Sequence, residues 1–419
     1  MPDPMIPTLY KSSLAHMLAA VASGIALGLL DPHLAMQSKP LSEVFVRLIA
    51  LVMNPLIFCM LASGIASMRG ASRLGRTGGH ALIYFVAMSL LSLLAGLLAA
   101  TLLQPGAGFD AALGALAGES VPGQADGLGQ AGSLHWLLKL LSLAPRVNNL
   151  YLLLAAVPVG LLLAQPGARA DALLAGIDRL SCALFALVRL ILTLAPLAAF
   201  SAMAFTIGKY GLVSLLPLLK FILASYLACS VFILLVIGCA ARLAGLSLLR
   251  FLGYIREEMY IVFFTSSSLA ALPRLTEKLQ RMGCARSIVA LVLPFGYSLN
   301  LAGTNLYIAM AILFLAQAAQ IELGWMQLFT ILVVSMMTSK GAVGIAGSGF
   351  ATLAATLAVL NIVPVDMVAL LLGIDRMMKC RSLTNVIGNG VACVLVAAWE
   401  QGLDREKMAV VLGGSGPGS

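Results

Sequence analysis

The stretch from residue 296 to 307 reads GYSLNLAGTNLY and lies inside a long apolar segment. It contains Asn300, Gly303, Thr304 and Asn305 but no charged side chain. Backbone that leaves the helical ladder at membrane depth needs a polar partner, because lipid offers none. We therefore expect a helix interrupted at Gly303, since glycine tolerates non-helical backbone angles. Freed carbonyls and amide side chains there would supply oxygen ligands for a small cation.

The rest of the chain is strongly apolar. Its 419 residues are 61% hydrophobic and 10% charged, whereas soluble domains carry about 25% charged residues. Several runs reach the roughly 20 apolar residues that cross a bilayer. The composition therefore predicts an all-α polytopic membrane protein. The net charge of +9 requires no nucleic-acid partner, because Lys and Arg gather in the cytoplasmic loops of membrane proteins.

Hydropathy predicts eight spanning segments, near residues 14–30, 43–66, 80–103, 135–165, 181–207, 213–243, 285–315 and 366–400. The loop near 66–79 carries arginines and no acid, whereas the loop at 104–133 carries acids and no Lys or Arg. This asymmetry predicts that the first loop is cytoplasmic and the second lies outside. With eight crossings, both termini are then expected in the cytoplasm.

Two further apolar segments, near 251–278 and 328–360, are interrupted by polar or small residues. The first contains three consecutive serines at 266–268, and the second contains the glycine-rich stretch SKGAVGIAGSGF at 339–350. A pair of broken hydrophobic segments is typical of a transporter binding site, and half-helix N-termini at such breaks suit an anion. The alternative is that these small residues only let helices pack closely.

The last apolar segment carries Arg381, and a charge within a span marks a functional site by default. On a straight helix, Arg381 shares a face with Thr384, Asn385, Gly388 and Asn389. Because its planar fork suits a carboxylate, Arg381 is predicted to be an anion clamp. Asp375, Lys379 and Ser382 would share another face, and Asp375 is expected to pair with Lys379 at i,i+4 rather than with Arg381.

Several stretches match a known family, including TSSS at 265–268, SKGAVGIAGSGF at 339–350 and SLTNVIGNGVA at 382–392. Over nearly its whole length the chain resembles the dicarboxylate/amino acid:cation symporter family, and within it the bacterial C4-dicarboxylate carriers. The resemblance implies eight transmembrane helices, two re-entrant helical hairpins, an elevator mechanism and a homotrimer. Residues 1–250 would be mainly scaffold, with 80–103 joining the transport domain at 251–401. Residues 402–419 would form a disordered cytoplasmic tail.

The resemblance also implies site residues. The positions expected to bind substrate are Ser266, Ser267, Ser268, Thr304, Gly344, Gly347, Lys379, Arg381 and Asn385. The positions expected to bind cations, partly through backbone carbonyls, are Ser298, Asn300, Leu301, Asn389, Ser339, Lys340 and Ala342. A sodium ion is expected at Asn300 and Asn389.

One cation site is expected to be lost, because the family has Asp at Ala302 and Tyr and Thr at Phe85 and Met88. A cation site needs negative oxygen ligands to offset dehydration. We therefore expect weakened or altered sodium coupling.

Further departures are Asn389, where many sodium-coupled members have Asp, and Leu269, where dicarboxylate carriers have Glu. The last helix is one residue short between Asp375 and Arg381, which puts Lys379 where an acid or serine is usual.

The predicted function is secondary transport of a small dianion such as succinate, fumarate or malate, with aspartate as a further candidate, across the inner membrane. The coupling ion is Na⁺ or H⁺, and no other cofactor is expected; the partners are the anionic substrate and membrane lipid. One alternative is a proton-coupled carrier or exchanger in which a bulged last helix lets Lys379 replace a cation. Others are an anion channel, or a family member that binds without transporting. No nucleophile–base or metal-ligand pattern predicts an enzyme.

Overall fold

The computed structural model describes residues 6–42, 75–107, 149–165, 167–211, 215–341, 348–363, 367–375 and 377–413, with scattered positions from 44 to 66. Across these residues the regular structure is helical, and the one strand-like pairing is an isolated bridge between Cys284 and Leu403. The predicted all-α class is confirmed for this part of the chain.

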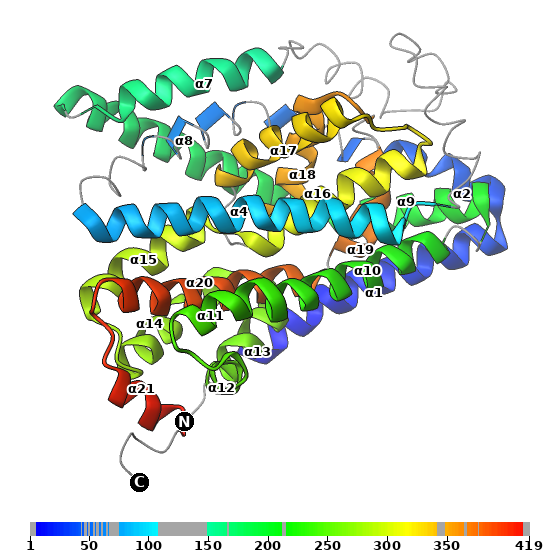
Figure 1. The fold of residues 1–419 in the computed structure, drawn as a ribbon. Helices are drawn as coiled ribbons and strands as arrows, with labels where there is room; N and C mark the ends of the chain where they lie inside the picture. Colours follow the sequence, from blue (N-terminus) through cyan, green and yellow to red (C-terminus); the bar gives the residue numbers. More distant parts are fainter. Residues whose placement is uncertain are drawn as a thin grey trace.

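Four helical stretches of the described chain are long and apolar enough to cross a membrane, which confirms a polytopic membrane protein. They are Arg76–Leu103, Leu215–Leu243, Arg286–Ala318 and Lys379–Trp399. In Figure 1 the helices α4 (Gly75–Leu103), α10 (Leu215–Phe232) and α20 (Lys379–Trp399) run in roughly one direction, and α10 packs on both others. A π-helical segment at Ile233–Ile237 joins α10 to α11 (Gly238–Leu243).

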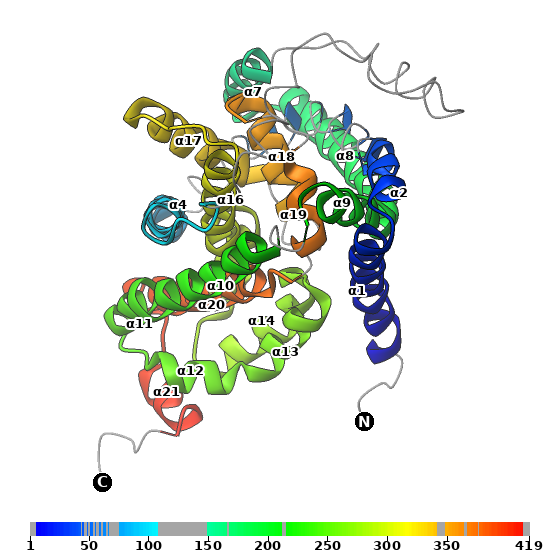
Figure 2. The ribbon, with the colours of Figure 1, turned by 90° about the vertical axis from the view of Figure 1, so that its right-hand side faces the viewer.

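A second group of helices lies apart from α4, as Figure 2 shows. It comprises α1 (Ile6–Leu30), α2 (Pro32–Gln37), α8 (Ala168–Ile191) and α9 (Ala195–Tyr210), with α7 (Asn149–Leu163) packed on α8. Helix α1 packs along α9, and Gly28 of α1 leaves no room for a side chain against Ile207. The predicted span 181–207 is not continuous, because a 3₁₀ turn at Leu192–Leu194 separates α8 from α9.

Helix α15 (Arg286–Leu299) leads into α16 (Ala302–Ala318). Almost every residue of α16 is buried, and α4 packs along it. The predicted interruption is present, but it falls at Asn300 and Leu301, where the backbone angles are not helical. Gly303 is itself helical, so the expectation that it forms the break is wrong.

Both further interruptions are also present. Helices α12 (Leu248–Tyr254) and α13 (Arg256–Thr265) lead to Ser266, whose φ of 55° is left-handed. A 3₁₀ turn at Ser268–Ala271 and α14 (Leu272–Arg281) follow.

In the second segment, α17 (Trp325–Thr338) ends in a 3₁₀ turn at Ser339–Gly341, and α18 (Ser348–Leu360) follows. The hydroxyls of Thr338 and Thr356 lie 2.8 Å apart and tie α17 to α18.

The last predicted span is two helices rather than one. Helix α19 (Val368–Asp375) ends before α20 begins at Lys379. The phenol of Tyr226, on α10, donates a 2.8 Å hydrogen bond to the carbonyl of Met377 within this interruption. Faces read from a straight helix therefore do not hold across it.

The tail is ordered over part of its length, so the expectation of disorder is wrong for α21 (Arg405–Val411). The Asp404 carboxylate caps α21 by accepting a 3.0 Å bond from the Lys407 amide. The Asp404 amide donates to the carbonyl of Gly283 at 2.9 Å. Gly283 has a φ of 110° and sits too close to Asp404 for any side chain.

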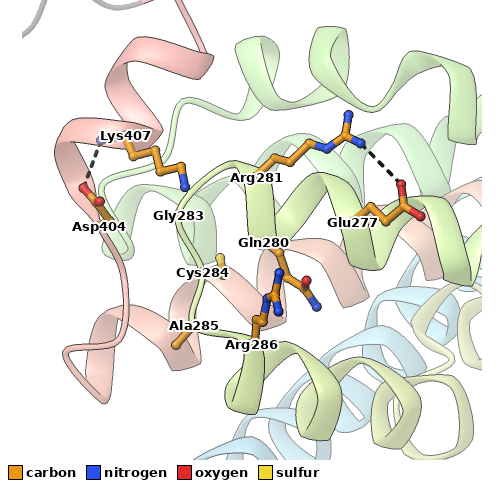
Figure 3. Close-up of a pocket in the computed structure, with 9 residues that line it drawn as sticks. All are labelled: Glu277, Gln280, Arg281, Gly283, Cys284, Ala285, Arg286, Asp404 and Lys407. Atoms are coloured by element: carbon orange, nitrogen blue, oxygen red, sulfur yellow. Dashed lines mark hydrogen bonds and ion pairs between the residues drawn. The ribbon is translucent and has the colours of Figure 1, made fainter.

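Figure 3 shows this junction and the shallow surface pocket beside it, of about 550 Å³, lined by Arg281, Arg286 and Lys407 among others.

Candidate substrate and cation sites

Arg381 lies in the buried first turn of α20, where its Nη1 donates to Asp375 Oδ1 at 2.9 Å. Both side chains are 7% exposed. The interruption after Asp375 lets the carboxylate reach a residue that a straight helix would point away from it. The expected pairing of Asp375 with Lys379 is therefore replaced by a pair with Arg381. A buried guanidinium without a partner is strongly destabilising, so this carboxylate keeps Arg381 inside the protein.

The guanidinium of Arg381 also packs against an aromatic ring and a neighbouring helix. Arg381 lies over the Tyr307 ring, 4.7 Å from its centroid, in cation–π geometry. On α18, a Cβ at Gly349 would lie 2.5 Å from Nη1 of Arg381. The N-terminal turn of α18, just after the glycine-rich stretch, thus lies directly against the charged group. Sequence reasoning missed Tyr307, although it follows Thr304 by three residues and so shares its helix face.

Asn385 joins α20 to the start of α16. Its Oδ1 accepts from the amide of Gly303 at 2.8 Å and from that of Thr304 at 3.4 Å. Its Nδ2 donates to Thr304 Oγ1 at 3.1 Å. Gly303 lies against the carbonyl of Arg381, where no side chain fits. The structure therefore brings Thr304, Asn385 and Arg381 together at a helix N-terminus, the end of a helix that favours anions.

Lys379 faces the first interrupted segment. Its ammonium contacts Ser266 Oγ, and Ser382 Oγ donates to the Ser266 carbonyl at 3.3 Å. Ser268 Oγ donates to the Ser382 carbonyl at 3.3 Å. The amide of Ser267 donates to the Thr265 hydroxyl at 3.2 Å. Ser266 and Ser268 therefore lie against the first turn of α20, together with Lys379, and Ser267 lies between them in the chain.

Two of the predicted cation positions meet beside the interruption of α15 and α16. Asn300 Nδ2 donates to Asn389 Oδ1 at 3.0 Å, and both residues are at most 1% exposed. Among the described residues, Asn300 Oδ1 and Asn389 Nδ2 have no hydrogen-bond partner. A buried amide oxygen without a donor is a hard ligand that fits a small cation.

The other predicted cation-binding positions differ in their exposure and in their hydrogen bonds. Ser298 is exposed at the end of α15, and the carbonyl of Leu301 accepts the Asn305 amide at 2.9 Å. Ser339 Oγ donates to the Met336 carbonyl at 3.3 Å. The remaining predicted positions, Ala342, Gly344 and Gly347, lie outside the described residues.

Lys340 was expected to bind a cation through its backbone carbonyl. In the structure its side chain also reaches the end of α15, beside the interruption between α15 and α16. The ammonium contacts Ser89 Oγ and donates to the Leu299 carbonyl at 2.8 Å. Ser89 lies on α4, next to the predicted lost positions Phe85 and Met88, both of which are buried. Sequence reasoning missed this contact, because a lysine 251 residues from Ser89 carries no local signal of its partner.

The described residues contain no group of three His, Cys, Asp or Glu side chains that could hold a metal ion. A buried arginine, an anion-favouring helix end and interrupted membrane segments instead define a secondary transporter with discontinuous helices. The profile described as the Sodium:dicarboxylate symporter family matches residues 14–399. The chain belongs to this family, as its sequence motifs predicted, and it is a transporter family rather than an enzyme family.

Curated relatives agree with this assignment. Proteins named C4-dicarboxylate transport protein from Burkholderia pseudomallei (strain 668), Burkholderia thailandensis and Burkholderia ambifaria are each 48% identical to this chain over 413 residues. The match covers 97% of this chain and 96% of each relative.

Proposed function

We propose that this protein is a secondary carrier of small C4-dicarboxylates, such as succinate, fumarate and malate, with aspartate as a further candidate. The observation that carries this proposal is the buried Arg381, held by Asp375 and Tyr307 beside Thr304 and the start of α16. The pair uses Nη1, while a guanidinium has further donors for the two oxygens of a substrate carboxylate. The names of the relatives support the same substrate class.

The second substrate carboxylate calls for a second cation, and Lys379 is the residue we assign. It lies two residues before Arg381 and therefore on a different face of α20, where its ammonium reaches the tip of the first interrupted segment at Ser266. A cation at this place attracts a carboxylate and repels an ammonium. The charge pattern therefore favours a dicarboxylate over an amino acid such as aspartate.

In this proposal the chain has eight spanning helices and two re-entrant hairpins, formed by α13–α14 and α17–α18. The core at 251–401, together with α4, moves like an elevator against the remaining helices of a homotrimer in the inner membrane, with both termini cytoplasmic. The separation of α1, α2 and α9 from α4 is compatible with such a division. The interruptions at Ser266 and at Ser339–Gly341 would lie at the hairpin tips.

Sodium is the proposed coupling ion, and Asn300 and Asn389 would hold it. Their amide oxygens are uncharged, which supports weak coupling because no carboxylate offsets the loss of the ion's water. The alternative is proton coupling or exchange with Lys379 in place of a cation. The interruption before Lys379, whose ammonium contacts Ser266, supports this alternative.

Uptake of labelled succinate and aspartate into proteoliposomes, under separate sodium and proton gradients, tests these assignments. We expect saturable succinate uptake that is accelerated by internal unlabelled succinate, because a carrier exchanges its substrate. Uptake that does not saturate and shows no counterflow would indicate a channel. Binding without uptake would indicate a transport-defective member.

A further inference from the structure

The side chain of Lys340 ends at an interruption in the helical core. Its ammonium contacts Ser89 Oγ of α4 and donates to the Leu299 carbonyl at 2.8 Å, at the last residue of α15. Ser89 Oγ itself donates to the Phe85 carbonyl at 2.7 Å. Lys340 therefore crosses from the end of α17 to the contact between α4 and α15.

The oxygens at this place are of the kind that binds a cation. The Leu299 carbonyl lies where the helical ladder stops, and a serine hydroxyl adds a second hard oxygen. Phe85 and Met88, beside Ser89 on α4, and Ala302, at the start of α16, carry no oxygen in their side chains. All three are at most 4% exposed. A sodium ion would find too few ligands here to replace its water. An ammonium needs fewer, because it brings its own three donors.

We propose that the ammonium of Lys340 is a tethered cation, which occupies the position between α4 and α15 that a mobile sodium ion would otherwise use. This role explains how the chain can lack acidic and hydroxyl ligands around Ser89. The charge is supplied by the protein, so nothing must be bound from solution at this place. Sodium coupling would then be confined to Asn300 and Asn389.

The charges of the core support this assignment. Among the described buried or half-buried residues around the site, Arg381, Lys379 and Lys340 are positive and Asp375 is negative. Over these described residues the charges sum to a positive value, which favours an anion, and a dianion more than a monoanion. This charge argument rests on the proposed dicarboxylate function, whereas the proposal that the Lys340 ammonium occupies the position beside Ser89 does not.

The test restores an acid and removes the tether, without substrate. Thermal unfolding is measured in sodium chloride and in choline chloride for Ala302→Asp and for Ala302→Asp combined with Lys340→Met. We expect sodium to stabilise the double variant markedly more than the single variant, because Lys340 already neutralises an acid at 302. Ala302→Asp combined with Lys340→Arg, which retains the charge, should respond to sodium like the single variant. Lys220→Met, at an exposed position of α10, controls for loss of a lysine.

Equal sodium stabilisation of the single and double variants would overturn the proposal. A second readout is succinate affinity in choline, which Lys340→Met should weaken by about tenfold or more, because the core loses a positive charge that favours the anionic substrate. Lys340→Arg should retain most of the affinity. Unchanged affinity in Lys340→Met would also contradict the tethered cation. If the unaltered protein binds no dicarboxylate, the proposed function fails, while the comparison in sodium without substrate still decides the role of Lys340.

Discussion

Replacing Asp375 with Asn should destabilise the empty protein and tighten its binding of succinate. Asp375 is the partner of a guanidinium that is 7% exposed, and the two groups share a 2.9 Å hydrogen bond. Asparagine keeps the shape and an acceptor oxygen but removes the negative charge. The substitution therefore leaves Arg381 buried with a neutral neighbour until an anion arrives.

The size of each effect follows from the burial of the pair. Breaking a buried ion pair by removing one partner costs about 3–5 kcal/mol. The retained amide oxygen should keep the loss of stability near the lower value. A substrate carboxylate about 8 Å from Asp375 would be repelled by roughly 2 kcal/mol at an effective dielectric constant of about 20. Relief of this repulsion corresponds to about thirtyfold tighter binding.

Thermal unfolding with a thiol-reactive dye suits this chain, because Cys229, Cys380 and Cys393 are buried free thiols. We expect Asp375→Asn to unfold at a lower temperature without substrate and to be stabilised by succinate more than the unaltered protein. Glu322→Gln, at an exposed acid, is the matched control. Weaker succinate binding in Asp375→Asn would contradict this prediction and would indicate that Asp375 positions Arg381 for the substrate rather than opposing the substrate's charge.

Three further predictions follow from contacts around the core. Gly349→Ala places a methyl group 2.5 Å from Nη1 of Arg381. Succinate affinity, measured by titration calorimetry, should therefore fall by about tenfold or more while the protein stays folded. Asn385→Ala removes the side-chain cap of α16, so thermal unfolding should reveal a loss of about 1–2 kcal/mol, together with reduced uptake. At the end of α20, partial burial opposes ionisation of Glu400, but its hydrogen bond with His80 and a nearby arginine charge lower its pKa below the ordinary 4.5. The depressed pKa adds stability above about pH 4.5 that is lost as pH falls through the folded value, and this loss should be smaller in the unfolding temperatures of His80→Gln, in which the arginine contribution remains.

Much of the architecture could be predicted because membrane depth leaves few options for an apolar chain. Hydropathy located the long helices, and clusters of serine, glycine and asparagine located the interruptions. The residue at which each helix is interrupted could not be predicted, because glycine allows an interruption without requiring one. Gly303 is helical and instead makes room for the Arg381 carbonyl, while the ladder stops at Asn300.

The site was predicted in its residue types and only partly in its contacts. Thr304, Asn385 and Arg381 meet as expected, because they lie on faces of helices that pack together. The partner of Arg381 was wrong, since helical periodicity was carried through an interruption that the sequence does not mark. The amine of Lys340 was missed for a different reason, because its contact with Ser89 depends on how α17 packs near α4.

The most direct test of the account is succinate uptake by Arg381→Ala in proteoliposomes, with thermal unfolding to confirm that the variant is folded. Loss of the guanidinium removes the buried charge around which Thr304 and Asp375 are arranged. We predict that uptake of dicarboxylates disappears while the folded protein is retained. Uptake by the folded variant at the rate of the unaltered protein would contradict it.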